Sequence, residues 1–101
     1  MRLKDKIIEK KATIGIIGLG YVGLPLAVRF ASAGFDITGI DIDEGKVTKV
    51  NQGKSDVPDV REKEIKRLVS QGKLRATIDY DALGNLDVII ICVPTPLRKT
   101  K

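Results

Sequence analysis

The spacing of apolar residues changes several times along this 101-residue chain, and each change predicts a new element. The run from Ala12 to Gly18 is apolar without polar alternation, which is typical of a strand buried on both faces. From Tyr21 to Ala33 apolar residues recur at helical spacing, and Gly34 follows as a stop signal. A second apolar run, from Phe35 to Ile42, predicts a second strand, in which Gly39 indicates a close approach of the helix. The helix positions expected to face inward are Val22, Leu26, Phe30 and Ala33.

Capping and stop residues predict two further helices. Asp43 is placed to cap a short helix that ends at Gly53. After a polar loop, Asp59 and Glu62 have the spacing of a capping box, and the helix they open is expected to end at Gly72. The positions expected to face inward from these two helices are Val47, Val50, Ile65, Leu68 and Val69.

Two more strands are predicted in the last third of the chain. Leu74–Ile78 has the composition of a third strand, and residues 81–85 predict a turn or a single helical turn. Leu86–Val93 is the most apolar stretch, and the residues from Val88 to Ile91 are all β-branched. This pattern predicts a central strand buried on both faces, with Cys92 inside it as a small hydrophobic side chain rather than a nucleophile.

Strands that alternate with helices predict an α/β fold with a parallel sheet and right-handed crossovers. We expect a Rossmann-type sheet with strand order 3-2-1-4, the first part of a doubly wound fold. The chain ends five residues after Pro96, before a helix could cover the fourth strand, so the expected fold is truncated. We expect a basic N-terminal segment (1–11), a Rossmann domain that is a fragment of a larger enzyme (12–97) and a basic tail (98–101).

The loop between the first strand and the first helix carries three spaced glycines, Gly18, Gly20 and Gly23. The G-x-G-x-x-G spacing alone is weak evidence, but here it follows a strand and opens a helix, as in dinucleotide-binding folds. The first glycine allows a tight turn, the second lets a pyrophosphate approach the backbone, and the third lets helix and strand pack closely. The free N–H groups of the helix then attract the phosphates of NAD. The predicted cofactor-binding residues of this loop are Gly18, Leu19, Gly20, Tyr21, Val22 and Gly23.

Asp41 lies at the end of the second strand, eighteen residues after Gly23. A carboxylate there accepts hydrogen bonds from the adenosine ribose hydroxyls and repels a 2′-phosphate, which favours NAD over NADP. Asp41 could instead cap the following helix, but Asp43 already fits that role. Lys46 is placed to reach the ribose or a phosphate, and the alternative is a solvated surface lysine.

The segment Val93-Pro94-Thr95 leaves the carboxyl end of the fourth strand, the edge where ligands of open α/β sheets bind. Thr95 offers a hydroxyl and an N–H group toward the cofactor, so we predict that Val93, Pro94 and Thr95 border it. The alternative is a rigid exit from the strand, stiffened by proline.

The net charge of +5 does not indicate nucleic-acid binding, because it resides at the ends of the chain. Residues 1–11 carry five basic and two acidic groups, residues 98–101 add three basic groups, and the remainder has a charge of −1. A single cysteine and no histidine exclude an internal disulfide and give no metal-ligand cluster. No apolar run suits a signal peptide or a membrane span, so we expect a cytoplasmic protein.

Four segments together resemble one family: Ile14–Ala27, Gly34–Asp36, Gly39–Asp43 and Cys92–Leu97. They are similar to the N-terminal NAD-binding domain of the UDP-glucose/GDP-mannose family of nucleotide-sugar 6-dehydrogenases. Two sequence motifs most resemble the branch that acts on UDP-N-acetylglucosamine and UDP-N-acetylmannosamine: Tyr-Val-Gly-Leu-Pro-Leu-Ala and Val-Pro-Thr-Pro-Leu. One segment, Ser55–Val60, departs from the family pattern because it lacks the tyrosine often found there.

The resemblance implies an oxidoreductase of polysaccharide biosynthesis that oxidises the C6 hydroxyl of a UDP-sugar to a carboxylate in two NAD-dependent steps. The family's catalytic cysteine, lysine and asparagine have no counterpart here, so we expect this fragment to bind NAD without turnover and the full-length protein to be a homodimer. The positions that match the family's cofactor contacts are residues 18–23, Asp41, Lys46, Val93, Pro94 and Thr95.

Two other functions remain open at this point. One is the cofactor domain of a β-hydroxyacid-type dehydrogenase, which shares the Gly-Leu-Gly opening but often prefers NADP through an Asn-Arg pair where this chain has Ile42 and Asp43. The other is a non-catalytic NAD-binding module. The downstream coding sequence would distinguish the second alternative from a dehydrogenase.

Overall fold

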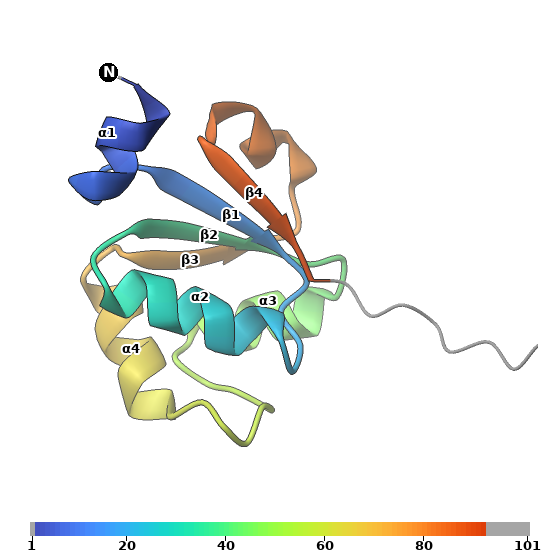
Figure 1. Cartoon of the computed structure of the whole chain (residues 1–101). Helices are drawn as coiled ribbons and strands as arrows, with labels where there is room; N and C mark the ends of the chain where they lie inside the picture. The colour runs from blue at the N-terminus through green and yellow to red at the C-terminus, as the bar shows by residue number, and fades with distance from the viewer. Residues whose placement is uncertain (1, 93–101) are drawn as a thin grey trace, which may run out of the picture.

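The computed structural model describes residues 2–92, which form a parallel sheet flanked by helices (Figure 1). Among these residues, three α-helices of eight to ten residues, one α-helix of six residues and one 3₁₀ helix of six residues accompany four strands. In chain order the elements are α1 (Leu3–Ile8), β1 (Thr13–Ile17), α2 (Gly23–Ser32), β2 (Asp36–Ile40), α3 (Glu44–Asn51), α4 (Glu62–Ser70), β3 (Leu74–Thr77), the 3₁₀ helix η1 (Tyr80–Asn85) and β4 (Val88–Ile91).

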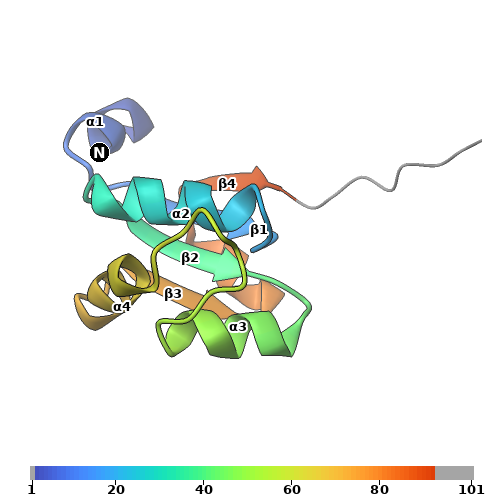
Figure 2. The ribbon, with the colours of Figure 1, turned by 90° about the horizontal axis from the view of Figure 1, so that it is seen from below.

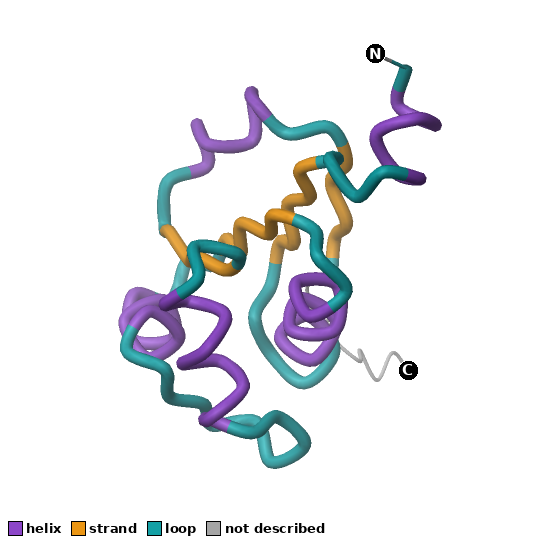
Figure 3. The backbone as a smooth tube through the Cα atoms, turned by 90° about the vertical axis from the view of Figure 1, so that its left-hand side faces the viewer, coloured by secondary structure: helices purple, strands orange, loops and turns teal. Residues whose placement is uncertain are grey.

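All strand pairs are parallel and the order is β3-β2-β1-β4, which confirms the predicted Rossmann-type sheet. Figure 3 shows α2, α3 and α4 on one face of the sheet and η1 on the other. This division follows from right-handed crossovers: the connections from β1 to β2 and from β2 to β3 run in one direction, and the connection from β3 to β4 runs back.

The core lies between the sheet and α2, α3 and α4, and aliphatic side chains fill it. Helix α2 buries Leu24, Ala27 and Ala31, whereas Val22 is 66% exposed. Ala33 is also exposed, and Leu26 and Phe30 are only partly buried, so the predicted inward face of this helix was wrong at both of its ends. The helix begins at Gly23, which is pressed against the backbone of Gly18, and this contact fixes which side of α2 meets the sheet.

The prediction of a central, fully buried fourth strand was wrong. Strand β4 pairs with β1 alone and forms one edge of the sheet among the described residues. Ile89 is 44% exposed and Ile91 is 68% exposed, and both share the face of Gly15, where the nearest side chains are those of Leu83 in η1 and of Leu86. Cys92 follows this strand instead of lying inside it, and it is half-buried.

The predicted cap of α3 is confirmed, whereas the capping box of α4 is not. The Asp43 side chain accepts hydrogen bonds from the N–H groups of Gly45 and Lys46. Helix α4 instead begins after Arg61 without a side-chain cap. Glu62 accepts a hydrogen bond from the Ser55 N–H group at 3.0 Å, so its carboxylate fixes the preceding loop rather than the helix end.

The N-terminal segment contains an element that the sequence analysis did not predict. Helix α1 contacts the sheet through Lys6, whose Nζ lies 2.9 Å from Asp87 Oδ1. Asp87 also accepts hydrogen bonds from the N–H and hydroxyl groups of Thr13. These hydrogen bonds, led by the one from the Thr13 backbone, hold the pKa of Asp87 below its ordinary value.

Candidate functional site

The glycine loop turns sharply at the carboxyl end of β1. Gly18 has a φ of 101°, a conformation that favours glycine, and its N–H group donates to the Ile40 carbonyl at 2.8 Å. The loop is thereby attached to the end of the neighbouring strand β2. Helix α2 begins five residues later, and Val22 at its N-cap makes no side-chain hydrogen bond to the first amides. Within the first turn, the Leu24 N–H group donates to the Gly20 carbonyl at 3.1 Å and Pro25 has no N–H group, so an anion would be received by the amides of the loop and of Gly23.

The two later glycines of the motif face very different surroundings. A Cβ on Gly23 would collide with the carbonyl oxygen of Gly18 and lie 2.8 Å from its carbon. A Cβ on Gly20 would meet only Lys46 Nζ, at 3.9 Å. The space above Gly20 is therefore open and bordered by a cation, as a bound pyrophosphate requires. The residues present fit a dinucleotide.

The Asp41 carboxylate is held by two backbone groups. Its Oδ2 accepts a hydrogen bond from the Leu19 N–H group at 2.8 Å, and its Oδ1 accepts one from the Asp43 N–H group at 2.9 Å. A carboxylate offers about four acceptor positions, so capacity remains for hydroxyl donors of a ligand. Because the Asp41 carboxylate is held beside the cleft, its negative charge disfavours the binding of an additional phosphate group at that position.

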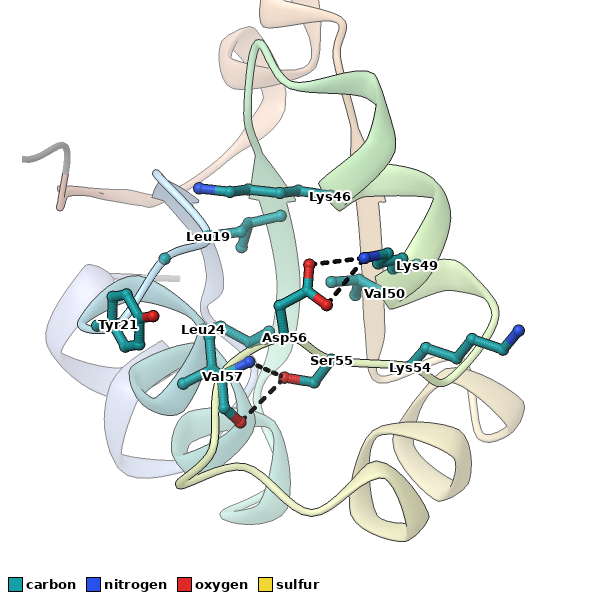
Figure 4. A pocket seen from close by; sticks show the side chains of 11 residues that line it. Leu19, Tyr21, Leu24, Lys46, Lys49, Val50, Lys54, Ser55, Asp56 and Val57 are labelled. Atoms are coloured by element: carbon teal, nitrogen blue, oxygen red, sulfur yellow. Dashed lines mark hydrogen bonds and ion pairs between the residues drawn. The ribbon is translucent and has the colours of Figure 1, made fainter.

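Lys46 extends from the first turn of α3 across the glycine loop. Figure 4 shows its side chain beside Leu19. No ion pair within residues 2–92 includes Lys46, whereas the nearby Lys49 is paired with Asp56 at 2.7 Å. An unpaired ammonium group beside an open glycine backbone is suited to a phosphate oxygen.

A cleft of about 880 Å³ opens over the glycine loop at the carboxyl edge of the sheet. Asp41 and Lys46 lie at its border with two apolar residues, Ile42 and Tyr80, which are 82% and 41% exposed. Apolar walls with few polar groups are typical of sites that hold an aromatic base. The cleft is lined by Gly18, Gly20, Tyr21, Val22, Asp41, Ile42, Asp43, Lys46, Tyr80, Ile91 and Cys92.

A smaller hollow of about 120 Å³ lies on the other side of Lys46 (Figure 4). It is bounded by the glycine loop and by the loop between α3 and α4, which crosses toward α2 (Figure 2). The Ser55 hydroxyl accepts a hydrogen bond from the Val57 N–H group at 2.8 Å. The segment that lacks the family's tyrosine therefore lines this hollow together with the glycine loop.

Most of the predicted site residues come together at the cleft. Gly18, Gly20, Tyr21, Val22, Asp41 and Lys46 line it. Leu19 and Gly23 are buried, so they reach the site only through the backbone. Val93, Pro94 and Thr95 lie outside the described residues.

Five further residues line the cleft without having been predicted as site residues: Ile42, Asp43, Tyr80, Ile91 and Cys92. A signal existed for Tyr80, because it follows a predicted parallel strand and so lies at the edge where ligands bind. Cys92 lies against the glycine loop: its backbone N–H group donates to the Ile17 carbonyl at 2.7 Å, and its Cβ would be 3.3 Å from a Cβ on Gly23.

Within residues 2–92 no helix combines the length and apolar character that a bilayer crossing requires. The same residues contain no group of three or more histidine, cysteine, aspartate or glutamate side chains arranged to hold a metal ion.

A glycine turn between a parallel strand and a helix, with a fixed carboxylate at the end of the next strand, defines a dinucleotide-binding domain of the Rossmann class. The chain belongs to the UDP-glucose/GDP-mannose dehydrogenase family, whose NAD binding domain matches residues 12–101. The resemblance found in the sequence and the assignment of NAD as cofactor are thereby confirmed at the level of the family.

Similar proteins agree with this assignment. The chain is 42% identical over 86 residues to a UDP-N-acetyl-D-mannosamine dehydrogenase of Pyrococcus horikoshii, a match that covers 83% of this chain and 20% of that protein. A solved UDP-D-ManNAc dehydrogenase from Pyrococcus horikoshii superposes with a TM-score of 0.79 at 41% identity and covers 85% of this chain and 21% of its own.

A GDP-mannose dehydrogenase from Pseudomonas aeruginosa, solved as a ternary complex, superposes with a TM-score of 0.77 at 37% identity. That superposition covers 85% of this chain and 20% of the other. The chain thus spans about a fifth of the length of the relatives it matches.

Proposed function

We propose that this chain is the NAD-binding part of a nucleotide-sugar 6-dehydrogenase that oxidises the C6 hydroxyl of a UDP-sugar to a carboxylate. The observation that carries the proposal is the open backbone at Gly20, bordered by Lys46 and by the fixed carboxylate of Asp41, in a chain that belongs to this dehydrogenase family. UDP-N-acetylmannosamine and UDP-N-acetylglucosamine are the sugars we favour, because the similar Pyrococcus horikoshii protein is named for the first of them.

Each residue has a distinct part in the proposed cofactor site. The backbone of Gly18 to Gly23 receives the pyrophosphate, Asp41 accepts hydrogen bonds from the adenosine ribose, and Lys46 neutralises a phosphate oxygen. Ile42 and Tyr80 supply apolar surface for the adenine. Val93, Pro94 and Thr95 border the nicotinamide half, which supplies hydride-accepting chemistry when NAD is bound.

The same proposal limits what these 101 residues do alone. Hydride transfer requires the C6 carbon of the sugar to be held against the nicotinamide, and the covalent step requires a positioned thiolate. We assign neither role to this chain and give Cys92 no catalytic role. In the longer protein we expect a cytoplasmic homodimer that binds no nucleic acid.

Calorimetric titration of the 101-residue chain with NAD and NADP tests the cofactor site. We expect binding of NAD and weaker binding of NADP. Spectrophotometric NAD reduction with UDP-sugars tests the activity, with turnover expected from the longer gene product and not from this chain. Turnover by the 101-residue chain alone, or no turnover of any nucleotide sugar by the longer product, would contradict the proposal.

A β-hydroxyacid-type dehydrogenase is not favoured as an alternative. A solved (S)-3-hydroxybutyryl-CoA dehydrogenase from Ralstonia eutropha superposes with a TM-score of 0.62, but at 21% identity this likeness concerns the fold alone. Ile42 and Asp43 follow the ribose-binding position, and Asp43 caps α3 through its side chain. An arginine that would receive a 2′-phosphate does not occur there.

A further inference from the structure

We infer that the close packing of the Leu19 side chain on Gly39, which we call the steric lock, fixes the position of the glycine loop relative to strand β2. This packing thereby positions the loop amides and the Asp41 carboxylate of the cofactor site. This inference deepens the proposed function and rests on the NAD site described above. Both residues act through the loop backbone, so they are positioning residues. Neither is expected to touch the cofactor with its side chain.

The first observation is the packing of the Leu19 side chain. Leu19 is 2% exposed although it lies in a loop between two residues of the open cleft. A Cβ added to Gly39 would lie 2.6 Å from Leu19 Cδ2 and 3.1 Å from Cδ1. The Leu19 side chain therefore occupies the space that any other residue at position 39 of β2 would need. The close approach that the sequence predicted for helix α2 is therefore made by the glycine loop.

The second observation is that three consecutive residues of the β2 end hold the same loop. Gly39 receives the Leu19 side chain, the Ile40 carbonyl accepts the Gly18 N–H at 2.8 Å, and Asp41 accepts the Leu19 N–H at 2.8 Å. The steric contact and the two hydrogen bonds all involve the Gly18-Leu19 dipeptide of the loop. A side chain that lifted Leu19 away from β2 would lengthen both hydrogen bonds.

A displacement of Leu19 would affect cofactor binding through the Asp41 carboxylate. Its carboxylate is oriented by the Leu19 N–H group on one oxygen and by the Asp43 N–H group on the other. If Leu19 moves, this carboxylate loses one of its two fixed donors, and the amides at Gly20 move with the loop. A glycine inside a strand lowers strand stability, so a lock of this kind gives Gly39 a specific purpose.

Gly15 provides a matched control on the opposite face of the sheet. A Cβ there would lie 2.5 Å from Leu86 Cδ1, so Gly15→Ala introduces a clash of the same size against a side chain near η1. Neither Gly15 nor Leu86 lines the cleft. Gly39→Ala and Gly15→Ala thus impose comparable packing strain, but only the first acts on the glycine loop.

The test measures NAD affinity by calorimetry and exchange of the Leu19 amide hydrogen by NMR in the 101-residue chain. Gly39→Ala is expected to weaken NAD binding by about tenfold, the equivalent of a lost hydrogen bond to a charged group, and to accelerate Leu19 exchange. Gly15→Ala is expected to lower the melting temperature while leaving the NAD affinity and the Leu19 exchange unchanged. The double variant Leu19→Ala/Gly39→Ala restores space and should recover part of the affinity lost in Gly39→Ala.

Equal effects of Gly39→Ala and Gly15→Ala on affinity and on Leu19 exchange would overturn the lock, as would a double variant no better than Gly39→Ala. If Gly39→Ala does not fold, Leu19→Val alone must accelerate exchange of the amide hydrogen at position 19. A wild-type chain that does not bind NAD would refute the proposed cofactor site. The exchange of the Leu19 amide would still decide whether the lock exists.

Discussion

Gly23 is packed so closely against Gly18 that the carbonyl of the first glycine occupies the space where a side chain of the third would begin. Gly20, between them, has open space above it, with Lys46 Nζ at 3.9 Å from a Cβ placed there. Two glycines of one motif are therefore required for different reasons: Gly23 for the packing of α2 on the loop, and Gly20 for access of a ligand to the backbone.

Gly23→Ala is expected to destabilise the fold. The added methyl group meets backbone atoms, which cannot move without shifting α2, and overpacking of this kind costs roughly 1–3 kcal/mol. Urea unfolding monitored by circular dichroism measures the change in the free energy of unfolding. A wild-type unfolding midpoint in the variant would contradict the close packing of Gly18 and Gly23.

Gly20→Ala is expected to preserve the fold and to weaken NAD binding. Its methyl group enters open space, so the free energy of unfolding should change by less than about 1 kcal/mol. The same methyl group stands where the pyrophosphate would approach, and we expect the dissociation constant for NAD to rise by about tenfold or more. Calorimetry and urea unfolding on the same sample separate the two effects. Wild-type affinity would show that the pyrophosphate binds elsewhere.

Asp41→Ala is expected to weaken NAD binding and to relax the discrimination against NADP. The substitution removes an acceptor for the ribose and the negative charge that repels a 2′-phosphate, and it frees the Leu19 N–H group. Titration with both cofactors measures the ratio of the two affinities. Asp79→Ala is a suitable control, because Asp79 caps η1 through the Asp81 N–H group and does not line the cleft. An unchanged ratio in Asp41→Ala would refute the ribose assignment.

Lys46→Ala distinguishes a cofactor ligand from a solvated surface lysine. An exposed ion pair contributes at most about 1 kcal/mol, so we expect the NAD affinity to fall by roughly threefold to fivefold and to depend less on salt. The control is Lys63→Ala, because Lys63 is an exposed residue of α4 far from the cleft lining. Identical salt dependence in the two variants would support the surface alternative.

Asp87→Asn tests the contact that joins α1 to the sheet. Because hydrogen bonds from Thr13 and Lys6 lower the pKa of Asp87 in the folded state, its contribution to stability is present above the ordinary value of 3.8 and is lost as the pH falls through the lower folded value. We expect Asp87→Asn to lower the melting temperature at pH 7, and the difference from wild type to shrink below pH 3.8. Thermal unfolding from pH 7 to pH 3 measures it. A difference that stays constant over this range would exclude an electrostatic origin.

The sequence predicted the strand order, the presence of a helix after each of the first two strands and the cap of α3, because these depend on apolar spacing and on short local motifs. The predictions from the sequence were wrong where burial or hydrogen bonding depends on which other segment lies against a residue. The β-branched run in β4 is as apolar as a central strand, but its neighbours place it at an edge with Ile91 68% exposed. Likewise Glu62 has the spacing of a capping box, but the loop at Ser55 offers its carboxylate a different donor.

The sequence by itself determined that this is a dinucleotide-binding α/β domain, because periodicity, the glycine spacing and an acidic residue at a strand end are local properties of the chain. The tertiary structure decided how the site is held. Asp41 and Leu19 are separated by 22 residues, and they meet only because β1 and β2 are parallel neighbours that end at the same edge. The burial of Leu19 over Gly39 has the same origin, since the fit of one side chain into the space left by another is set by the packing of two segments and not by either segment alone.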